Sequence, residues 1–220
     1  MSRKTKRPIF PDSYQGKNAE EYNHSYWMER NQKKTTLLCL QYLYDQHLDN
    51  IKDHDELSDI TYTILDLGSG TGFSSEILAE NGFRVIGVEI LKDMIYRAKQ
   101  KKTDYNDQLN IEYILADINY LPIRANIIDH IISISAYNFI IHSITTPKEK
   151  KVLLSQTAQY LNTILKNRGR FILEFYPADE KELNLFQSSF IHNGFNGFII
   201  KQNPNQKSGQ TFLLLKKQTN

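Results

Sequence analysis

The stretch of sequence that determines the fold reads Ile64-Leu65-Asp66-Leu67-Gly68-Ser69-Gly70-Thr71-Gly72. The apolar run 62–67 predicts a buried strand, and the pattern that begins at Phe73 predicts a helix directly after the glycine turn. Glycine lets the backbone approach a ligand closely, and the start of a helix offers free N–H groups. Strand, turn and helix together therefore predict a binding corner of the nucleotide type.

The spacing of the glycines distinguishes this corner from that of the dinucleotide-binding folds. Those folds require G-x-G-x-x-G, whereas this chain has D-x-G-x-G-x-G, with Asp66 at the end of the strand. An anion at the place where a diphosphate would lie favours a cationic ligand, such as one that carries the amino group of an amino acid. A bare strand–turn–helix corner that binds nothing is the alternative interpretation.

Length and composition limit the class of protein. The 220 residues are 40% hydrophobic, which is enough for the core of one domain, and the net charge of +2 neither requires nor excludes nucleic-acid binding. The single cysteine, Cys39, excludes an intrachain disulfide and a cysteine-based zinc site, and no metal is expected. No apolar run reaches the roughly 18 residues that span a bilayer, so we expect an intracellular protein without membrane contact.

Residues 1–59 precede the alternating strands and helices. Residues 1–18 are basic and contain two prolines, and they predict a mobile arm that is either solvated or bound to phosphate. Residues 19–59 predict a helical extension, with a helical pattern from Asn18 to about Leu48. Its aromatic side chains predict either packing of the helix onto the sheet or closure over a bound cofactor; they are Tyr22, Tyr26 and Trp27.

Residues 60–220 predict a Rossmann-like α/β core with a doubly wound, seven-stranded, mostly parallel sheet. Together with the extension, this core forms the predicted domain 19–220. The predicted strands are 61–67, 84–89, 111–116, 127–135, 170–175, 198–202 and 211–216. The predicted helices are 72–81, 93–102, 147–167 and 179–192.

Polar and apolar side chains gather at the predicted carboxyl ends of the strands, where open α/β sheets bind ligands. Glu89 ends the second strand about 20 residues beyond the turn, where a carboxylate accepts both hydroxyls of a ribose. Ile90 and Met94 follow it and could flank a purine.

The segment Asp66-Leu67-Gly68-Ser69-Gly70-Thr71-Gly72 resembles motif I of the class I S-adenosylmethionine (SAM)-dependent methyltransferases. The resemblance implies that SAM is the cofactor and that Asp117, after the third strand, accepts the adenine amino group. The residues then expected to bind the cofactor are Asp66, Gly68, Ser69, Gly70, Glu89, Ile90, Met94, Asp117, Ile118 and Ser133.

Further segments narrow the resemblance; they are 132–136, 175–177, 194–197, 203–205 and 212–214. Together they are similar to the small-subunit (18S) rRNA guanine-N7 methyltransferases. That resemblance implies rRNA methylation during ribosome biogenesis, on rRNA or a pre-ribosomal particle, in the cytoplasm or in the nucleus and nucleolus. It also implies a heterodimer with a small zinc-binding activator protein.

The predicted third strand suggests where such a partner binds. Residues 111–116 are apolar on both faces, and in class I methyltransferases this strand lies at a sheet edge. A set of basic side chains predicts either a basic face or a solvated helix surface; it consists of Lys148, Lys150, Lys151, Lys166, Arg168 and Arg170.

The predicted acceptor needs no general base, because guanine N7 has a lone pair and no proton to lose. We therefore assign no catalytic base. The residues expected to position the acceptor base by stacking and orientation are Tyr137, Asn138, Tyr176 and Pro177. Two alternatives stay open: a SAM-dependent methyltransferase of a tRNA base, a protein side chain or a small metabolite, and a SAM-binding assembly factor of the small subunit that acts without methylation.

Overall fold

The computed structural model describes residues 9–49, 61–105, 108–137, 144, 146–203 and 209–219. Its strands are β1 Thr63–Leu67, β2 Arg84–Glu89, β3 Ile111–Leu115, β4 Ile128–Ile134, β5 Leu165–Phe175, β6 Phe195–Gln202 and β7 Gln210–Lys217. Its α-helices are α1 Gly16–Asn23, α2 Tyr26–Leu43, α3 Phe73–Glu80, α4 Lys92–Tyr105, α6 Pro147–Ile164 and α7 Glu180–Ile191. The short 3₁₀ helices are η1 Asp12–Tyr14 and η2 Gln46–Leu48.

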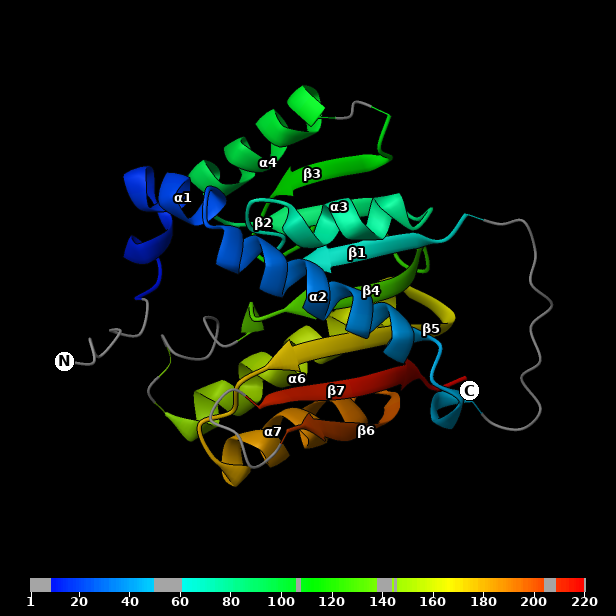
Figure 1. Cartoon of the computed structure of the whole chain (residues 1–220). Helices are drawn as coiled ribbons and strands as arrows, with labels where there is room; N and C mark the ends of the chain where they lie inside the picture. The colour runs from blue at the N-terminus through cyan, green and yellow to red at the C-terminus, as the bar shows by residue number, and fades with distance from the viewer. Residues whose placement is uncertain are drawn as a thin grey trace.

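The strands form one seven-stranded sheet in the order β3-β2-β1-β4-β5-β7-β6. β1 to β5 run parallel to one another, and β7 is antiparallel to both β5 and β6. The predicted doubly wound, mostly parallel sheet is confirmed. Because β1 occupies the middle of the parallel part, the glycine turn that follows it opens at the centre of the carboxyl edge (Figure 1).

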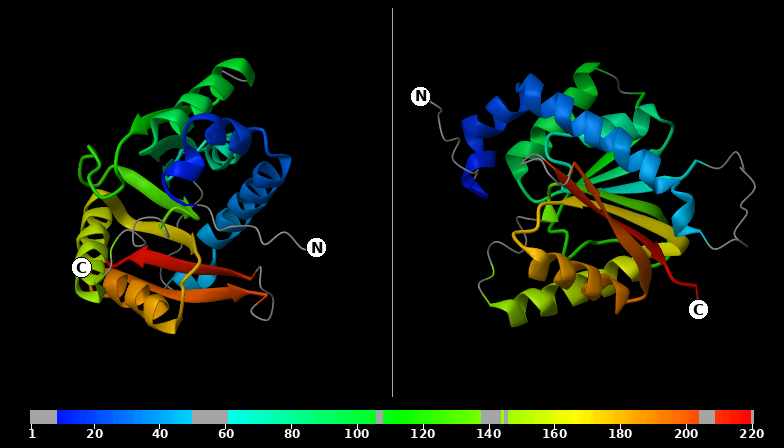
Figure 2. Two further views of the ribbon diagram at one scale, coloured as in Figure 1. Left: turned by 90° about the vertical axis from the view of Figure 1, so that its left-hand side faces the viewer. Right: turned by 60° about the horizontal axis from the view of Figure 1, so that its bottom comes forward.

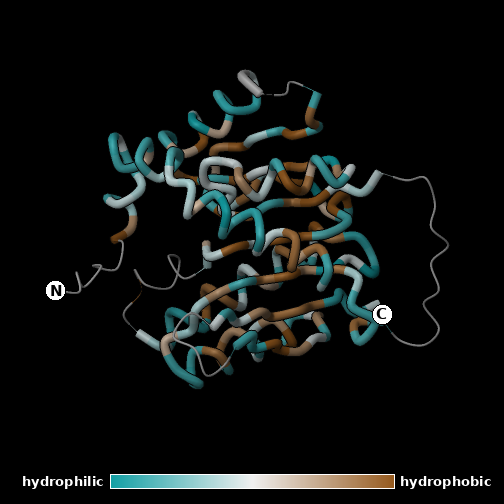
Figure 3. The backbone as a smooth tube through the Cα atoms, in the orientation of Figure 1, coloured by the Kyte–Doolittle hydropathy of each residue, from teal (hydrophilic) through white to brown (hydrophobic). Residues whose placement is uncertain are grey.

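Helices cover both faces of the sheet, as the right-hand view of Figure 2 shows, with α2 and α3 on one side and α6 and α7 on the other. The alternation along β1 produces two cores. Ile64 packs with side chains of α2 and α3, whereas Leu65 packs with side chains of α6 and α7. In Figure 3 the strands are mostly hydrophobic, whereas the helices alternate between hydrophilic and hydrophobic residues. Among the described residues no helix is both long and apolar enough to cross a membrane.

The N-terminal extension differs from the single long helix predicted from Asn18 to about Leu48. α1 already begins at Gly16, whose N–H donates to Asp93 Oδ2 of α4 at 2.6 Å. The chain then breaks before α2, because the Ser25 side chain caps this second helix by accepting from Met28 N at 3.4 Å. The predicted boundary between residues 18 and 19 thus falls inside α1, and the part of the predicted arm that the structure describes includes η1.

The junction of α6 and β5 also differs from the prediction. The helix was expected to run to Asn167 and to end at Gly169, but α6 ends at Ile164 and β5 begins at the next residue. The pairing of β4 with β5 is irregular just after this point, and Arg168 has a φ of 65° there. A bulge within the strand therefore occupies the residues that the sequence pattern assigned to the helix end.

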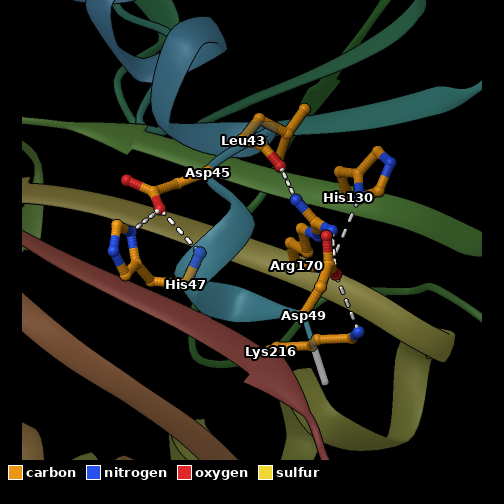
Figure 4. Close-up of polar contacts among 7 residues, drawn as sticks. All are labelled: Leu43, Asp45, His47, Asp49, His130, Arg170 and Lys216. Carbon is orange, nitrogen blue, oxygen red and sulfur yellow. Dashed lines mark hydrogen bonds and ion pairs between the residues drawn. The ribbon is translucent and has the colours of Figure 1, made fainter. Parts of the chain in front are cut away.

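A cluster of charged side chains ties the segment after α2 to the sheet at the end opposite the glycine turn (Figure 4). Asp49 accepts from Arg170 of β5 and from Lys216 of β7, the latter at 3.0 Å. Arg170 also donates to the Leu43 carbonyl at the end of α2. Its backbone N–H donates to His130 Nδ1 at 3.3 Å, and burial lowers the pKa of His130 to about 4, so the ring is neutral and can accept.

Replacing Asp49 with alanine is expected to destabilise the fold by about 2–4 kcal/mol, because Arg170 and Lys216 would keep their charges with side chains only 13% and 11% exposed. Burial raises the pKa of Asp49, but hydrogen bonds from Lys216 and Arg170 outweigh it and the net pKa is lowered. The stabilisation is therefore complete above the unfolded-state pKa and is lost as pH falls through the lower folded-state value. Urea unfolding at pH 7 and pH 3 measures both effects.

The matched control is Glu180→Ala, which breaks the exposed pair between Glu180 and Lys201. This pair has side-chain exposures of 72% and 42%, so its loss should change stability by less than about 1 kcal/mol. Equal losses in the two variants would contradict the role assigned to Asp49.

Candidate functional site

The glycine turn is closed by backbone contacts that only glycine permits at two positions. The N–H groups of Gly68 and Ser69 both donate to the Val88 carbonyl of β2 at 2.9 Å. Gly68 has a φ of +76°, and a Cβ there would lie 2.2 Å from the Ala136 Cβ. Gly72 has a φ of +88°, and a Cβ would lie 2.4 Å from the Tyr113 hydroxyl. The turn is therefore held between β2, β3 and the segment after β4.

Asp66 lies beneath this turn and not in the open corner where the sequence placed it. Strand alternation directs it towards α3, where Ser74 and Ser75 donate to its Oδ2, each at 2.6 Å. Its other oxygen, Oδ1, is buried without a hydrogen-bond partner among the described residues. Burial raises the pKa of Asp66 to about 6, although the two serine hydroxyls oppose the shift.

Glu89 lies at the tip of β2, next to the turn, as predicted. Its Oε2 accepts from Gly70 N at 3.0 Å and its Oε1 accepts from Leu91 N at 2.8 Å. Both oxygens are thus anchored by the backbone and retain lone pairs for a further donor. The side chain lines a cleft of about 2010 Å³ although it is only 7% exposed, and burial raises its pKa.

The wall of the cleft beyond Glu89 is largely apolar. Ile90, Met94 and Ile118 line it, and the exposed fraction falls from 47% at Ile90 to 8% at Ile118 and 3% at Met94. Asp117 lines the same wall and holds the next turn, because its Oδ1 accepts from the backbone and side-chain nitrogens of Asn119 at 2.8 and 3.0 Å. The four residues that the sequence predicted here therefore line one slot of the cleft; they are Ile90, Met94, Asp117 and Ile118.

The opposite end of the cleft is formed by the ends of β4, β5 and β7. Ser135 Oγ donates to Glu174 Oε2 at 2.7 Å, and Gln210 Nε2 donates to Glu174 Oε1 at 3.3 Å. Tyr176 also bonds Glu174, and burial together with this carboxylate raises the pKa of Tyr176. Ser135, Tyr176, Pro177 and Gln210 line the cleft, while Glu174 is fully buried behind them.

Besides Asp66, two further predicted site residues do not line the cleft. Ser133 is fully buried and donates to the Leu67 carbonyl at 2.9 Å, because its place in β4 turns it towards the neighbouring strand. Tyr137 is also fully buried, with its ring among Phe171, Phe186 and Phe190. Both predictions are corrected: the residues of this segment that reach the cleft are Ile134, Ser135 and Ala136.

Asn138, which was predicted to position the acceptor base, lies outside the part of the chain that the structure describes. The sequence pattern did not point to five other residues of the site, namely Thr71, Asn119, Ser135, Glu174 and Gln210. Glu174 offered a signal, because a carboxylate stands inside the apolar strand that ends at Phe175. In the described residues no group of three or more His, Cys, Asp or Glu side chains could hold a metal ion.

Comparison with known proteins identifies the class of protein to which this chain belongs. Residues 65–173, about half of the chain, match the family described as a methyltransferase domain. The structure of magnesium protoporphyrin IX methyltransferase from Synechocystis PCC 6803 is similar with a TM-score of 0.64 at 18% identity, over 94% of each chain. The chain therefore carries a methyltransferase domain with the fold of the class I SAM-dependent methyltransferases.

Similarity to curated proteins confirms the narrower resemblance. The 18S rRNA (guanine(1575)-N(7))-methyltransferase of Saccharomyces cerevisiae is 29% identical over 88% of this chain and 64% of its own length. An 18S rRNA (guanine-N(7))-methyltransferase of Schizosaccharomyces pombe is 28% identical over 69% of this chain and 55% of its own. The chain thus spans between about half and two thirds of the length of these relatives.

Proposed function

We propose that this chain transfers the methyl group of SAM to N7 of a guanine in small-subunit rRNA, inside the cell and during ribosome biogenesis. The resemblance to guanine-N7 methyltransferases over 88% of the chain carries this proposal. The cleft supports it, because one end presents anchored carboxylates and an apolar slot, while the other presents an aromatic ring and neutral polar groups.

The residues around the glycine turn fit SAM. Glu89 would accept the ribose hydroxyls, and Ile90, Met94 and Ile118 would enclose the adenine. Buried polar atoms without partners among the described residues remain for the amino-acid portion or for ordered water; they are Asp66 Oδ1, Ser69 Oγ and Thr71 Oγ1. When bound, SAM supplies a methyl group that its sulfonium charge has already activated for in-line displacement.

The residues at the other end of the cleft position the acceptor and need not remove a proton. Tyr176 is 46% exposed and offers a ring face on which an unstacked base can lie. Its raised pKa keeps the phenol protonated at neutral pH. Glu174 is fully buried and holds Ser135 and Gln210 in place by hydrogen bonds, so we assign it to positioning. An acceptor nitrogen that carries no proton suits this arrangement, because the chain then has only to align donor and acceptor.

Replacing every guanine by 7-deazaguanine tests the acceptor atom directly. Small-subunit rRNA transcribed with either base is incubated with the protein and methyl-labelled SAM, and the nucleosides are then analysed. We expect 7-methylguanosine from the guanine transcript and no label from the 7-deazaguanine transcript, which has carbon at the acceptor position. Equal labelling of both transcripts would assign the methyl group to another atom and contradict the proposal.

SAM affinity is expected to rise about tenfold between pH 5 and pH 7 and to level off above that range. Burial raises the pKa of Asp66 to about 6, so the free protein holds this carboxyl partly protonated in that window. The folded-state pKa of Asp66 lies above its unfolded-state pKa, so the unliganded fold loses stability as pH rises towards 6. Over the same range the affinity for a cationic ligand rises, because more of the carboxyl group is ionised. Calorimetric titrations at several pH values measure the profile. Asp66→Asn should flatten it, and a flat wild-type profile would contradict the role of Asp66.

We further propose that a small zinc-binding activator protein pairs with β3. This strand lies at the edge of the sheet and has β2 as its neighbour on one side. Leu115 is 53% exposed there, so a paired chain would cover both backbone groups and apolar surface. The N–H groups of β3 alternate between β2 and the open edge, and that of Ala116 donates to the Glu89 carbonyl of β2, so that of Leu115 faces the edge. Replacing Leu115 with proline should therefore weaken co-purification of the partner, whereas proline at exposed Lys181 of α7 serves only as a folding control. Unchanged co-purification would contradict this placement.

A further inference from the structure

The start of α2 places exposed aromatic side chains at the mouth of the cleft. Trp27, the single tryptophan of the chain, lines the cleft and is 67% exposed, and its neighbour Tyr26 is 75% exposed. Neither of them packs the helix onto the sheet, which corrects one interpretation of the sequence. Tyr22 alone of the three turns inward, where it stacks on Phe73 with ring centroids 6.2 Å apart. An exposed tryptophan beside a cleft marks a surface for binding.

Two positively charged side chains follow Trp27 along the same face of α2. Arg30 and Lys34 follow at intervals of three and four residues, both are exposed, and neither has an acidic partner in the described part of the chain. By contrast, Lys33 points to another side and binds Glu29 at 2.8 Å and Glu76 at 3.2 Å. The helix therefore carries two cations outward that the fold itself does not use.

Three cations of the basic set predicted from the sequence are paired within the described part of the fold. Lys150 bonds Glu182 and Lys166 bonds Asp129, at 3.5 and 2.7 Å, and Arg170 bonds Asp49. Three members of the basic set predicted from the sequence thus have structural partners. The predicted basic face does not form from these three side chains, and the α2 residues are the better placed cations, because their helix begins at the cleft.

We infer that Trp27, Arg30 and Lys34, here called the α2 stripe, bind single-stranded RNA that flanks the target guanine. This inference rests on the proposed function, since it concerns the same RNA substrate. An indole face stacks an unpaired base of any sequence, and a guanidinium and an ammonium group attract the phosphates that follow. Lys34 follows Trp27 by seven positions in α2, a rise of about 10 Å along the helix axis.

The arrangement of the elements gives the RNA a direct path. α1 and the start of α2 lie at the end of the sheet to which the β1 and β3 arrows point, and α2 then crosses the outer face (Figure 1). A strand whose target base enters the cleft can therefore continue past Trp27 and along α2. The polar groups at the cleft floor would hold the target base, and the stripe would hold its neighbours.

Binding of a fluorescently labelled, unstructured RNA oligonucleotide tests the stripe in the full chain co-expressed with its activator. Trp27→Ala should weaken binding about 5- to 100-fold. Arg30→Gln and Lys34→Gln should each lower the slope of log Kd against log salt concentration by about one. Lys181→Gln, which removes an exposed cation from α7, should leave both quantities unchanged.

Tryptophan emission gives a second reading of the same contact. RNA should quench a component of the emission that is present in the wild type and missing in Trp27→Phe. Because Trp27, Arg30 and Lys34 are exposed, their variants should melt at the wild-type temperature and bind SAM with the wild-type affinity. Lost SAM affinity with unchanged RNA affinity would overturn the inference and favour closure of Trp27 over the cofactor.

The outcomes separate this inference from the proposed function. If the wild type forms 7-methylguanosine in rRNA but the stripe variants bind RNA as the wild type does, the inference is wrong and the function stands. If the wild type transfers no methyl group to rRNA and the stripe still binds RNA, the proposed reaction is wrong but the inferred RNA-binding surface is supported. Loss of activator binding alone in the stripe variants would also overturn the inference, because it would make the stripe a protein interface.

Discussion

Gly68→Ala is expected to lower the affinity for SAM about 100-fold or more and to destabilise the fold by about 2–5 kcal/mol. The added Cβ would lie 2.2 Å from the Ala136 Cβ, at a φ of +76° that alanine adopts with strain. The turn must then move, and with it the Gly70 N–H that anchors Glu89. Calorimetric titration with SAM and urea unfolding measure the two losses.

The chain offers both a control and a rescue for this substitution. Gly82 has a φ of +89° but nothing within 4 Å of a built Cβ, so Gly82→Ala should cost about 1–2 kcal/mol and leave SAM affinity unchanged. Adding Ala136→Gly to Gly68→Ala removes the clash and leaves the Ala136 Cα at 3.6 Å, an ordinary contact. The double variant should recover part of the affinity. No recovery would show that the contact with Ala136 does not determine the turn.

Glu89→Ala should weaken SAM binding by a similar factor, about 100-fold, because two hydrogen bonds to a charged acceptor are lost. The backbone donors at Gly70 and Leu91 would also lose their acceptor, which loosens the turn itself. Calorimetry with SAM measures the change. Glu112→Ala on the neighbouring strand is the matched control, since that carboxylate is exposed and pairs with Arg84 at 3.1 Å.

A deoxy ligand distinguishes contact with the ribose from damage to the turn. The wild type should bind S-adenosylhomocysteine more tightly than its 2′-deoxy analogue, by about tenfold for one hydrogen bond to a carboxylate. Glu89→Ala should bind both ligands equally weakly. A preference that persists in the variant would contradict the assignment of Glu89 to the ribose.

The sequence predicted the parts of the site that depend on local pattern. The glycine turn, the carboxylate at Glu89 and the apolar residues after it follow from one strand–turn–helix unit and the next strand tip. Positions within a strand were less predictable. Ser133 and Tyr137 lie on either side of Ser135, whose φ of 56° redirects the chain, so spacing along the sequence did not reveal which side chains face the cleft.

The sequence did not predict the long-range contacts of the site, for a different reason. Glu174 meets Ser135 and Gln210 only after β4, β5 and β7 pair, and these residues are separated by 39 and 36 positions. The break between α1 and α2 was missed because the polar residues around Ser25 also fit a continuous helix. The exposure of Trp27 followed from that break, since α2 begins at the cleft mouth and not within a longer helix.

Titration of the full chain, co-expressed with the proposed activator, with SAM in a calorimeter tests the central claim most directly. The claim is that the turn after β1 and the tip of β2 form a site for this sulfonium nucleoside. We expect saturable binding of one SAM per chain, with micromolar affinity that Gly68→Ala lowers about 100-fold or more and Gly82→Ala preserves. Absence of heat on addition of SAM and of S-adenosylhomocysteine to the folded wild-type complex would contradict it.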